Sequence, residues 1–184
     1  EENLDRGNFS LDAVIPHQCP CCGEPTRIHE TSGRGENGEE RVIKTLFCDN
    51  AACETRRLKQ FVHFVSKKAM NIEGLSEGTL EKLIGRGWIH SYLDIYRLDQ
   101  HRNEIIRMDG FGEKSYQNLI DSIERAKNTT LPRLIFGLGI LNIGLANARM
   151  ICKAFDFDLD RIRNASAEDF AQIDGVGEVI AKSI

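Results

Sequence analysis

Cysteines are the residues of this chain whose spacing points most directly to chemistry. Five of the six cysteines lie between positions 19 and 53. Two of these form a C-x2-C pair followed by Gly23, and two more form a C-x4-C pair. Two such pairs can give Zn²⁺ four thiolates in tetrahedral geometry. The expected ligands of one zinc ion are Cys19, Cys22, Cys48 and Cys53. Four protein ligands leave no open position for water, so the predicted site is structural.

Disulfide bonds are the competing use of these cysteines. The sequence shows no secretory signal and no apolar run approaching ~20 residues, which favours a reducing compartment and a metal site. Cys21 could replace Cys22 in a C-x-C pair, although the longer spacing before Gly23 is favoured. Cys152 falls on an apolar helix face and is expected to be a small core residue.

A five-residue pattern, apolar-x-small-apolar-small, occurs four times beyond about residue 61. The copies are 72–76, 108–112, 140–144 and 173–177. Their last residues are spaced by 36, 32 and 33 positions, which indicates an array of one repeated unit. Apolar residues at helical spacing flank the copies, so each unit is predicted to be a helix, a tight turn and a helix.

The two small positions of each copy suggest an anion site. A glycine lets the backbone reverse, and the apolar residue after it can anchor the turn. The second small residue opens a helix whose first N–H groups lack intrahelical partners and lie at the positive end of its dipole. Copies two and four keep both glycines, whereas copy one ends at Ser76 and copy three has Asn142 at the first position. For these two copies a purely packing role is the alternative.

This unit resembles the helix-hairpin-helix module. In that family the hairpin amides hold a backbone phosphate of DNA, usually through the minor groove and without reading sequence. The strongest contacts are expected from copies two and four, with the lysines adding charge. The residues that the resemblance implies for DNA binding are Gly74, Ser76, Gly110, Phe111, Gly112, Lys114, Ile143, Gly144, Gly175, Val176, Gly177 and Lys182.

The charge balance does not by itself indicate a DNA-binding protein. The net charge is -4, and both the first 65 residues and the rest carry slightly more acidic than basic side chains. Any positive surface must therefore be local, and binding should be modest and salt-sensitive. Basic residues in or beside the repeats are Lys67, Lys68, Lys82, Arg86, Lys114, Arg133, Arg149, Lys153 and Lys182.

The order of the motifs narrows the resemblance. A four-cysteine finger is followed by the segments His63 to Leu75, Asp109 to Ser115 and Leu138 to Gly144. In this order the motifs look like bacterial NAD-dependent DNA ligase over about residues 16–184. That family activates a lysine with AMP from NAD and seals nicks in DNA. No Lys-x-Asp-Gly motif occurs in the chain, so the resemblance implies a piece of a longer protein, inactive alone, with NAD bound elsewhere.

The resemblance also implies partners and a location. The partners are duplex DNA, in particular nicked duplex, and the adenylation and oligonucleotide-binding domains of the same protein. The protein is expected to be a monomer in the bacterial cytoplasm, associated with the nucleoid and not with a membrane. Two alternatives are a helix-hairpin-helix DNA-binding module of a repair nuclease or junction-binding protein, and a scaffold whose hairpins only pack.

The expected fold is mainly α, a helix-hairpin-helix array preceded by a small four-cysteine zinc finger with a short β-hairpin. Residues 1–16 are expected to be a tail or linker, 17–60 the finger and 61–184 the four-copy array, cut short at its C-terminal end. In the finger, a strand at 42–47 is predicted to pair with 27–30 across an exposed loop at 31–41.

Three further expectations concern the array. An amphipathic helix is predicted to join the finger to the repeats and to bury Phe61, Phe64 and Val65. A connecting helix is predicted at 88–100, with Trp88 as a core residue. The four units are expected to share one core, and His63 is expected to hold a hydrogen-bonded structural or phosphate-facing role instead of binding metal.

Overall fold

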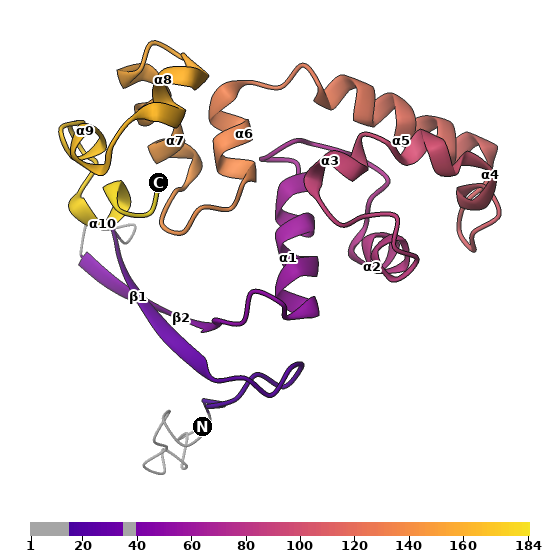
Figure 1. Ribbon diagram of the computed structural model, residues 1–184, viewed down its shortest axis with the longest axis horizontal. Helices are drawn as coiled ribbons and strands as arrows, with labels where there is room; N and C mark the ends of the chain where they lie inside the picture. The colour runs from indigo at the N-terminus through magenta and orange to yellow at the C-terminus, as the bar shows by residue number, and fades with distance from the viewer. Residues whose placement is uncertain (1–14, 35–39) are drawn as a thin grey trace, which may run out of the picture. The chain divides into compact units, whose positions relative to one another are not determined.

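The computed structural model describes residues 15–34 and 40–184, which are mainly helical as predicted. The chain forms two compact units, Glu1–Arg57 and Leu58–Ile184. Most of the predicted tail, residues 1–14, lies outside the described residues. The elements in chain order (Figure 1) are β1 (Thr26–Arg34), β2 (Glu40–Cys48), α1 (Glu54–Val65), α2 (Glu77–Gly85), α3 (Tyr92–Ile95), η2 (Leu98–His101), α4 (Arg102–Ile105), α5 (Glu113–Ala126), α6 (Leu131–Gly137), α7 (Leu145–Ala154), α8 (Leu159–Asn164), α9 (Ala167–Ala171) and α10 (Glu178–Ala181).

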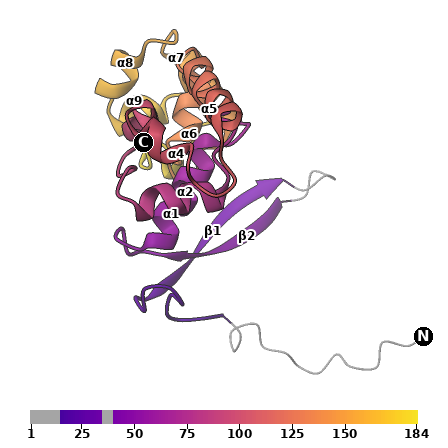
Figure 2. The same cartoon turned by 90° about the vertical axis from the view of Figure 1, so that its right-hand side faces the viewer.

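The first unit is built on an antiparallel pair of strands, β1 and β2, whose twist is visible in Figure 2. The register runs from Thr26 opposite Cys48 to Arg34 opposite Glu40. The predicted hairpin is confirmed, but the predicted loop at 31–41 is wrong where it covers 31–34 and 40–41, which lie in the strands; residues 35–39 lie outside the described residues. Backbone groups make the ladder, so it continues through polar residues that give no apolar signal.

This unit has very little apolar interior. Among its described residues only Cys19 and Cys53 are buried. Ile28, Val42 and Leu46 on the strands are all exposed. The free energy that holds this unit together must therefore come from something other than a hydrophobic core.

The second unit contains four helical hairpins. The paired helices are α1 with α2, α4 with α5, α6 with α7, and α9 with α10. The predicted amphipathic helix is confirmed as α1, which buries Phe61, Phe64 and Val65. Segments α3 and η2 connect the second helix of hairpin one to hairpin two, and α8 makes the corresponding connection between hairpins three and four.

The predicted continuous helix at 88–100 is wrong. The chain instead forms the four-residue helix α3 and the four-residue 3₁₀ turn η2. The Asp94 carboxylate accepts hydrogen bonds from the backbone N–H groups of His90 (2.9 Å) and Ser91 (2.8 Å), so it caps a new helix start inside the predicted segment. Trp88 is half-buried and stacks on His101 with ring centroids 4.6 Å apart.

The four hairpins pack around two cores, so the prediction of one shared core is wrong. One cluster of buried residues runs from Phe61 to Ala126 and holds hairpins one and two. The other runs from Ile135 to Ala181 and holds hairpins three and four. Cys152 is fully buried in the second cluster, which confirms its prediction as a core residue. The two hairpins of each pair therefore bury their apolar faces mainly against each other.

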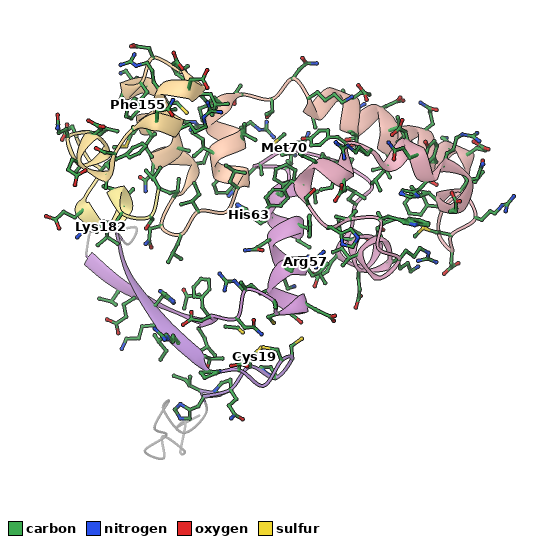
Figure 3. All side chains as sticks on the ribbon, in the orientation of Figure 1. Cys19, Arg57, His63, Met70, Phe155 and Lys182 are labelled. Atoms are coloured by element: carbon green, nitrogen blue, oxygen red, sulfur yellow. The ribbon has the colours of Figure 1, made fainter. Side chains whose placement is uncertain are left out.

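Helix α6 fastens the second pair of hairpins to the first. The ring Nε2 of His63 on α1 lies 2.7 Å from the backbone oxygen of Phe136 (Figure 3), which confirms a hydrogen-bonded structural role for this histidine. The Arg133 guanidinium donates to the carbonyl oxygens of Ala69 (2.7 Å) and Lys67 (2.6 Å). A Cβ added at Gly137 would lie 3.3 Å from the Ala69 side chain, so α6 approaches this segment closely.

Candidate metal centre and nucleic-acid interface

Four cysteine sulfurs converge at the base of the first unit. Cys19 and Cys22 lie on the turn before β1, Cys48 ends β2, and Cys53 directly precedes α1. Their Sγ atoms all lie within 4.8 Å of one another, with Cys19 to Cys53 at 3.9 Å and Cys22 to Cys48 at 3.5 Å. Figure 3 shows sulfur atoms gathered beside the labelled Cys19. The four predicted ligands are thus brought together, and the exposed Cys21 is not part of the cluster.

The turn between the first two ligands is a knuckle. Gly23 has a φ of 74° and donates its N–H to the carbonyl oxygen of Cys19 at 2.9 Å. The backbone N–H groups of Cys22 and then Cys21 donate to the Cys19 sulfur and lower the pKa of this thiol to about 7. The peptide groups therefore favour the thiolate, the form that binds metal.

The chemistry of the cluster fits zinc. A tetrahedral site with Zn–S bonds near 2.3 Å places its sulfurs about 3.8 Å apart, close to the two separations above. Burial raises the pKa of the Cys48 thiol to about 12, so at neutral pH this thiolate needs a cation to form. Four thiolates would saturate the ion, so the cluster is suited to a structural metal and not to catalysis.

The four hairpin turns share one backbone geometry. The first small residue of each copy has a left-handed backbone, with φ of 92° at Gly74, 83° at Gly110, 65° at Asn142 and 82° at Gly175. In copies two, three and four, the next residue donates its N–H to the carbonyl oxygen of the first apolar residue at 2.9–3.1 Å. Asn142 thus supplies the same backbone angle as glycine, as expected for an asparagine.

The apolar residue between the small positions anchors each turn. Leu75, Ile143 and Val176 are each 5% exposed, whereas Phe111 is half-buried. The side chains point into the two cores, so the outward surface of each turn is formed by backbone and by the second small residue. This arrangement agrees with the anchoring role that the sequence predicts for this position.

The second small residue is the N-cap of the following helix in all four copies. Gly112, Gly144 and Gly177 have extended backbones, and a Cβ added at any of them would meet nothing within 4 Å. They offer no side chain to cap the helix. In contrast, the Ser76 hydroxyl accepts a hydrogen bond from the N–H of Thr79 at 3.2 Å. The N-cap side chain of copy one satisfies one amide of its own helix, whereas the glycine N-caps cannot.

The second hairpin concentrates positive charge. Lys114 is exposed in the first turn of α5. Lys82, from helix α2, reaches the same turn and donates to the carbonyl oxygen of Asp109 at 3.4 Å. The Gly112 N–H already donates to the Ser115 hydroxyl at 2.8 Å, whereas the amides of Glu113 and Lys114, in the first turn of α5, have no intrahelical acceptor.

The ranking of the hairpins for DNA binding stays a prediction, but the geometry of the third and fourth hairpins bears on it. Copy three was expected to be weaker because of Asn142, yet its turn and its Gly144 N-cap match those of copies two and four. The Oδ1 atom of Asn142 is buried and has no hydrogen-bond partner among the described residues. In copy four, Lys182 lies 3.6 Å from the Glu178 carboxylate, which partly offsets its charge.

The sequence comparisons agree with this geometry. Residues 133–184, from α6 to the end of the chain, match a family described as helix-hairpin-helix motif. A protein of Ruminiclostridium cellulolyticum named DNA ligase is 44% identical over 182 residues, which is 99% of this chain. Proteins of the same name from Lachnoclostridium phytofermentans and Acetivibrio thermocellus are 46% and 38% identical over 99% and 97% of the chain.

The chain is homologous to one segment of the DNA ligases. It spans about a quarter of the length of these relatives, 26%, 26% and 25% respectively. The ligase resemblance inferred from the order of cysteines and hairpins is therefore confirmed. In the part of the chain that the structure describes, no helix is both long and apolar enough to cross a membrane.

Proposed function

We propose that this chain is the non-sequence-specific DNA-binding portion of an NAD-dependent DNA ligase that seals nicks during replication and repair. Its hairpins grip backbone phosphates of nicked duplex, and it has no ligase activity alone. NAD, the catalytic lysine, and the adenylation and oligonucleotide-binding domains belong to the rest of the same protein. That protein works as a monomer in the bacterial cytoplasm, associated with the nucleoid.

The observation that carries this proposal is that the second helix of three hairpins begins at a glycine N-cap, which has no side chain to cover the helix N–H groups. Nothing in the fold requires glycine at Gly112, Gly144 or Gly177, because their φ angles are not left-handed and the space beside them is empty. A side chain there would instead stand between the helix N–H groups and an approaching anion. A row of bare helix starts suits phosphates, which carry no base information and so allow a ligase to accept any sequence.

The four cysteines have a supporting role in this proposal. They hold one structural zinc ion, which replaces the core that the first unit lacks. Zinc supplies no chemistry to the sealing reaction, since its four sulfur ligands leave no position for substrate. The ion links the turn before β1, the last residue of β2 and the residue before α1.

The test is a substitution series at the N-caps. Gly112→Val and Gly177→Val should each weaken binding of nicked duplex about tenfold, because the new side chain blocks the helix amides. Ser76→Val is the matched control and should weaken it less, since Ser76 already places a side chain at that helix start. Fluorescence anisotropy at about 50 mM and 200 mM salt measures the affinities, and thermal melts check that the variants remain folded.

Three results would contradict the phosphate-gripping function. The first is no binding by the unsubstituted chain at low salt, and the second is binding that does not respond to salt. The third is an equal loss in all three variants, which would show that the bare N-caps do not distinguish the hairpins.

A further inference from the structure

A cleft in the second unit combines basic side chains with apolar walls. Its volume is about 660 Å³, and its lining comes from the loop after α1, the start of α6, helix α7 and the turn that ends α7. The apolar walls include Leu131, Leu145 and Phe157. The basic residues of the lining are Lys67, Lys68, Arg133 and Arg149. No acidic side chain is among the described residues that line the cleft.

Three of these cations are available to a ligand. Lys67, Lys68 and Arg149 are exposed, and within residues 15–34 and 40–184 none of the three pairs with a carboxylate. By contrast, other exposed cations of the second unit form ion pairs, as Lys59 does with Glu77 at 2.7 Å. The three unpaired cations therefore attract a partner that carries several negative charges.

Arg133 holds the cleft in shape. Its guanidinium donates to the carbonyl oxygens of Lys67 at 2.6 Å and Ala69 at 2.7 Å, and so fastens the loop after α1 to α6. The backbone that carries Lys67 and Lys68 is thereby fixed before any partner arrives. A preformed loop lowers the entropy cost of binding.

The turn at the end of α7 holds an aromatic ring in contact with solvent. The Phe157 side chain is 59% exposed, although burial of a phenylalanine is ordinarily favourable. Asp156 and Phe157 both have left-handed backbones, with φ of 54° and 58°, which is costly for residues other than glycine. The Phe157 N–H donates to the carbonyl oxygen of Cys152 at 2.7 Å, so α7 fixes this conformation. A strained turn that exposes an aromatic ring marks a candidate binding site.

The acids beside this turn are already engaged. The Asp156 carboxylate lies 2.6 Å from the Arg161 guanidinium. The Asp158 carboxylate accepts the N–H of Arg161 at 3.0 Å and caps α8, and Asp160 pairs with Arg163 at 3.0 Å. These carboxylates therefore leave the positive charge of the cleft largely uncompensated.

The size and lining of the cleft favour a partner with a protruding apolar side chain. The volume falls within the range of about 300–1,000 Å³ that is typical of pockets for compact ligands. A nucleic-acid duplex is a convex rod with its charges on the outside, so it would cross the mouth of such a pocket and leave the apolar walls in water. An apolar side chain of a peptide can instead enter between Leu131 and Leu145. Carboxylates on either side of it can then reach Lys68 and Arg149.

We propose that this cleft docks a short acidic segment of a partner protein, in which one apolar side chain is flanked by carboxylates. The apolar side chain packs against Leu131, Leu145 and the Phe157 ring, and the carboxylates pair with the three unpaired cations. Arg149 can bind a carboxylate through two parallel hydrogen bonds, which adds geometric specificity to the charge. This interaction does not depend on the proposed DNA binding.

The test uses a fluorescein-labelled peptide with one phenylalanine between two pairs of aspartates. The full 184-residue chain should bind it saturably in the micromolar range at about 50 mM salt, and more weakly as salt screens the charge pairs. Lys68→Glu and Arg149→Glu should each weaken binding about tenfold, because like charges then face each other. Arg125→Glu is the matched control, because Arg125 is exposed on α5 and does not line the cleft.

Two comparisons test the apolar part of the site. A peptide with alanine in place of phenylalanine should bind about tenfold more weakly, because it loses the burial of the ring. Phe157→Ala should weaken binding of the phenylalanine peptide about threefold, and Phe157→Trp should retain it. Since the Phe157 ring is exposed in the free protein, Phe157→Ala should change Tm by no more than about 2 °C.

Amide NMR shifts identify the occupant of the cleft. The peptide should shift the signals of residues 66–69, 131–133, 145–149 and 157 and leave those of 113–115 in place. If duplex DNA shifts the cleft signals and the peptide does not, the proposal is wrong. Equal affinity for the phenylalanine and alanine peptides, or equal effects of Arg149→Glu and Arg125→Glu, would show unspecific attraction of anions and would also overturn it. Self-association of the chain that Phe157→Ala abolishes would mean that a second copy, and not a partner protein, fills the cleft.

Discussion

The two small residues of each hairpin turn are small for different physical reasons. The first has a left-handed φ in every copy, and this angle alone explains Gly74, Gly110 and Gly175 and permits Asn142. The second has an extended backbone and empty space beside its Cα in the three glycine copies. Folding accounts for the first position and leaves the second unexplained, and the proposed phosphate contact would explain the glycine at the second position.

At the same scale, the proposed metal ligands can be told apart from Cys21. This cysteine lies between two proposed ligands in sequence, but its side chain is exposed and outside the sulfur cluster. Cys22→Ser should therefore abolish stoichiometric zinc binding, because a serine hydroxyl is a poor zinc ligand beside three thiolates. Cys21→Ser should retain one zinc per chain.

Metal analysis of the purified variants by mass spectrometry measures both results. The reverse outcome, in which Cys21→Ser loses zinc and Cys22→Ser keeps it, would mean that the first knuckle is the C-x-C pair. Retention of zinc by both variants would mean that either cysteine can complete the site.

At the scale of elements, short helices depend on their caps. Helix α9 has five residues and begins with a capping box in which Asp169 accepts hydrogen bonds from the backbone N–H of Ser166 (2.8 Å) and from its hydroxyl (2.9 Å). Helix α3 has four residues and begins in the same way with Asp94. Helices this short are not stable alone, so these bonds and the packing of one apolar side chain position them.

This capping predicts a pH dependence. Hydrogen bonds from the Ser166 backbone N–H and hydroxyl hold the pKa of Asp169 below its ordinary value of 3.8. A depressed pKa stabilises the fold at pH values above the ordinary one, and this contribution is lost as pH falls through the folded-state pKa. Asp169→Ala should therefore lower Tm by roughly 1–3 °C at pH 7, and the difference from the unsubstituted chain should shrink as pH falls well below 3.8.

Thermal melts followed by circular dichroism across this pH range measure the effect. Glu168→Ala, a change at the exposed neighbour, is the control and should shift Tm less. A difference between the Asp169 variant and the unsubstituted chain that stays constant down to low pH would show that the carboxylate does not act through its charged form.

Helix α6 has a different task, because it joins the two cores of the array. His63, Arg133 and Gly137 make its contacts with the segment from α1 to Ala69. These contacts set the position of hairpins three and four relative to hairpins one and two. The residues proposed to bind phosphate and the residues that set the spacing of the hairpins are therefore different sets.

At the scale of the whole molecule, local patterns were predictable and long-range groupings were not. The hairpins, the grouping of Cys19, Cys22, Cys48 and Cys53 and the amphipathic helix α1 follow from spacings of a few residues, and the structure confirms all three. Lys67, Arg149 and Phe157 line one cleft although they are up to 90 positions apart, so no window of sequence shows this grouping. The same holds for Lys82 at the second hairpin.

Two predictions based on composition were wrong because hydrogen bonds to backbone groups determine the local structure there. The polar segment from 31 to 41 resembled a loop, yet strand pairing extends into it from both ends. The apolar segment from 88 to 100 resembled one helix, yet the Asp94 side chain caps a fresh start inside it. The division into two cores was also missed, because apolar spacing shows which residues are buried and not which neighbours bury them.

The two units differ in what stabilises them, and this difference predicts how the whole chain responds to loss of metal. The first unit buries only two cysteines among its described residues, whereas the second has two apolar cores. Structural zinc contributes on the order of 10 kcal/mol to folding in small domains without a core. A zinc chelator should therefore unfold β1 and β2 while helices α2 to α10 remain.

Hydrogen exchange followed by mass spectrometry should show protection lost in the strands and kept in α5. The Cys22→Ser variant should already show this pattern and should not respond further to chelator. Loss of protection in α5 would mean instead that both units unfold as one.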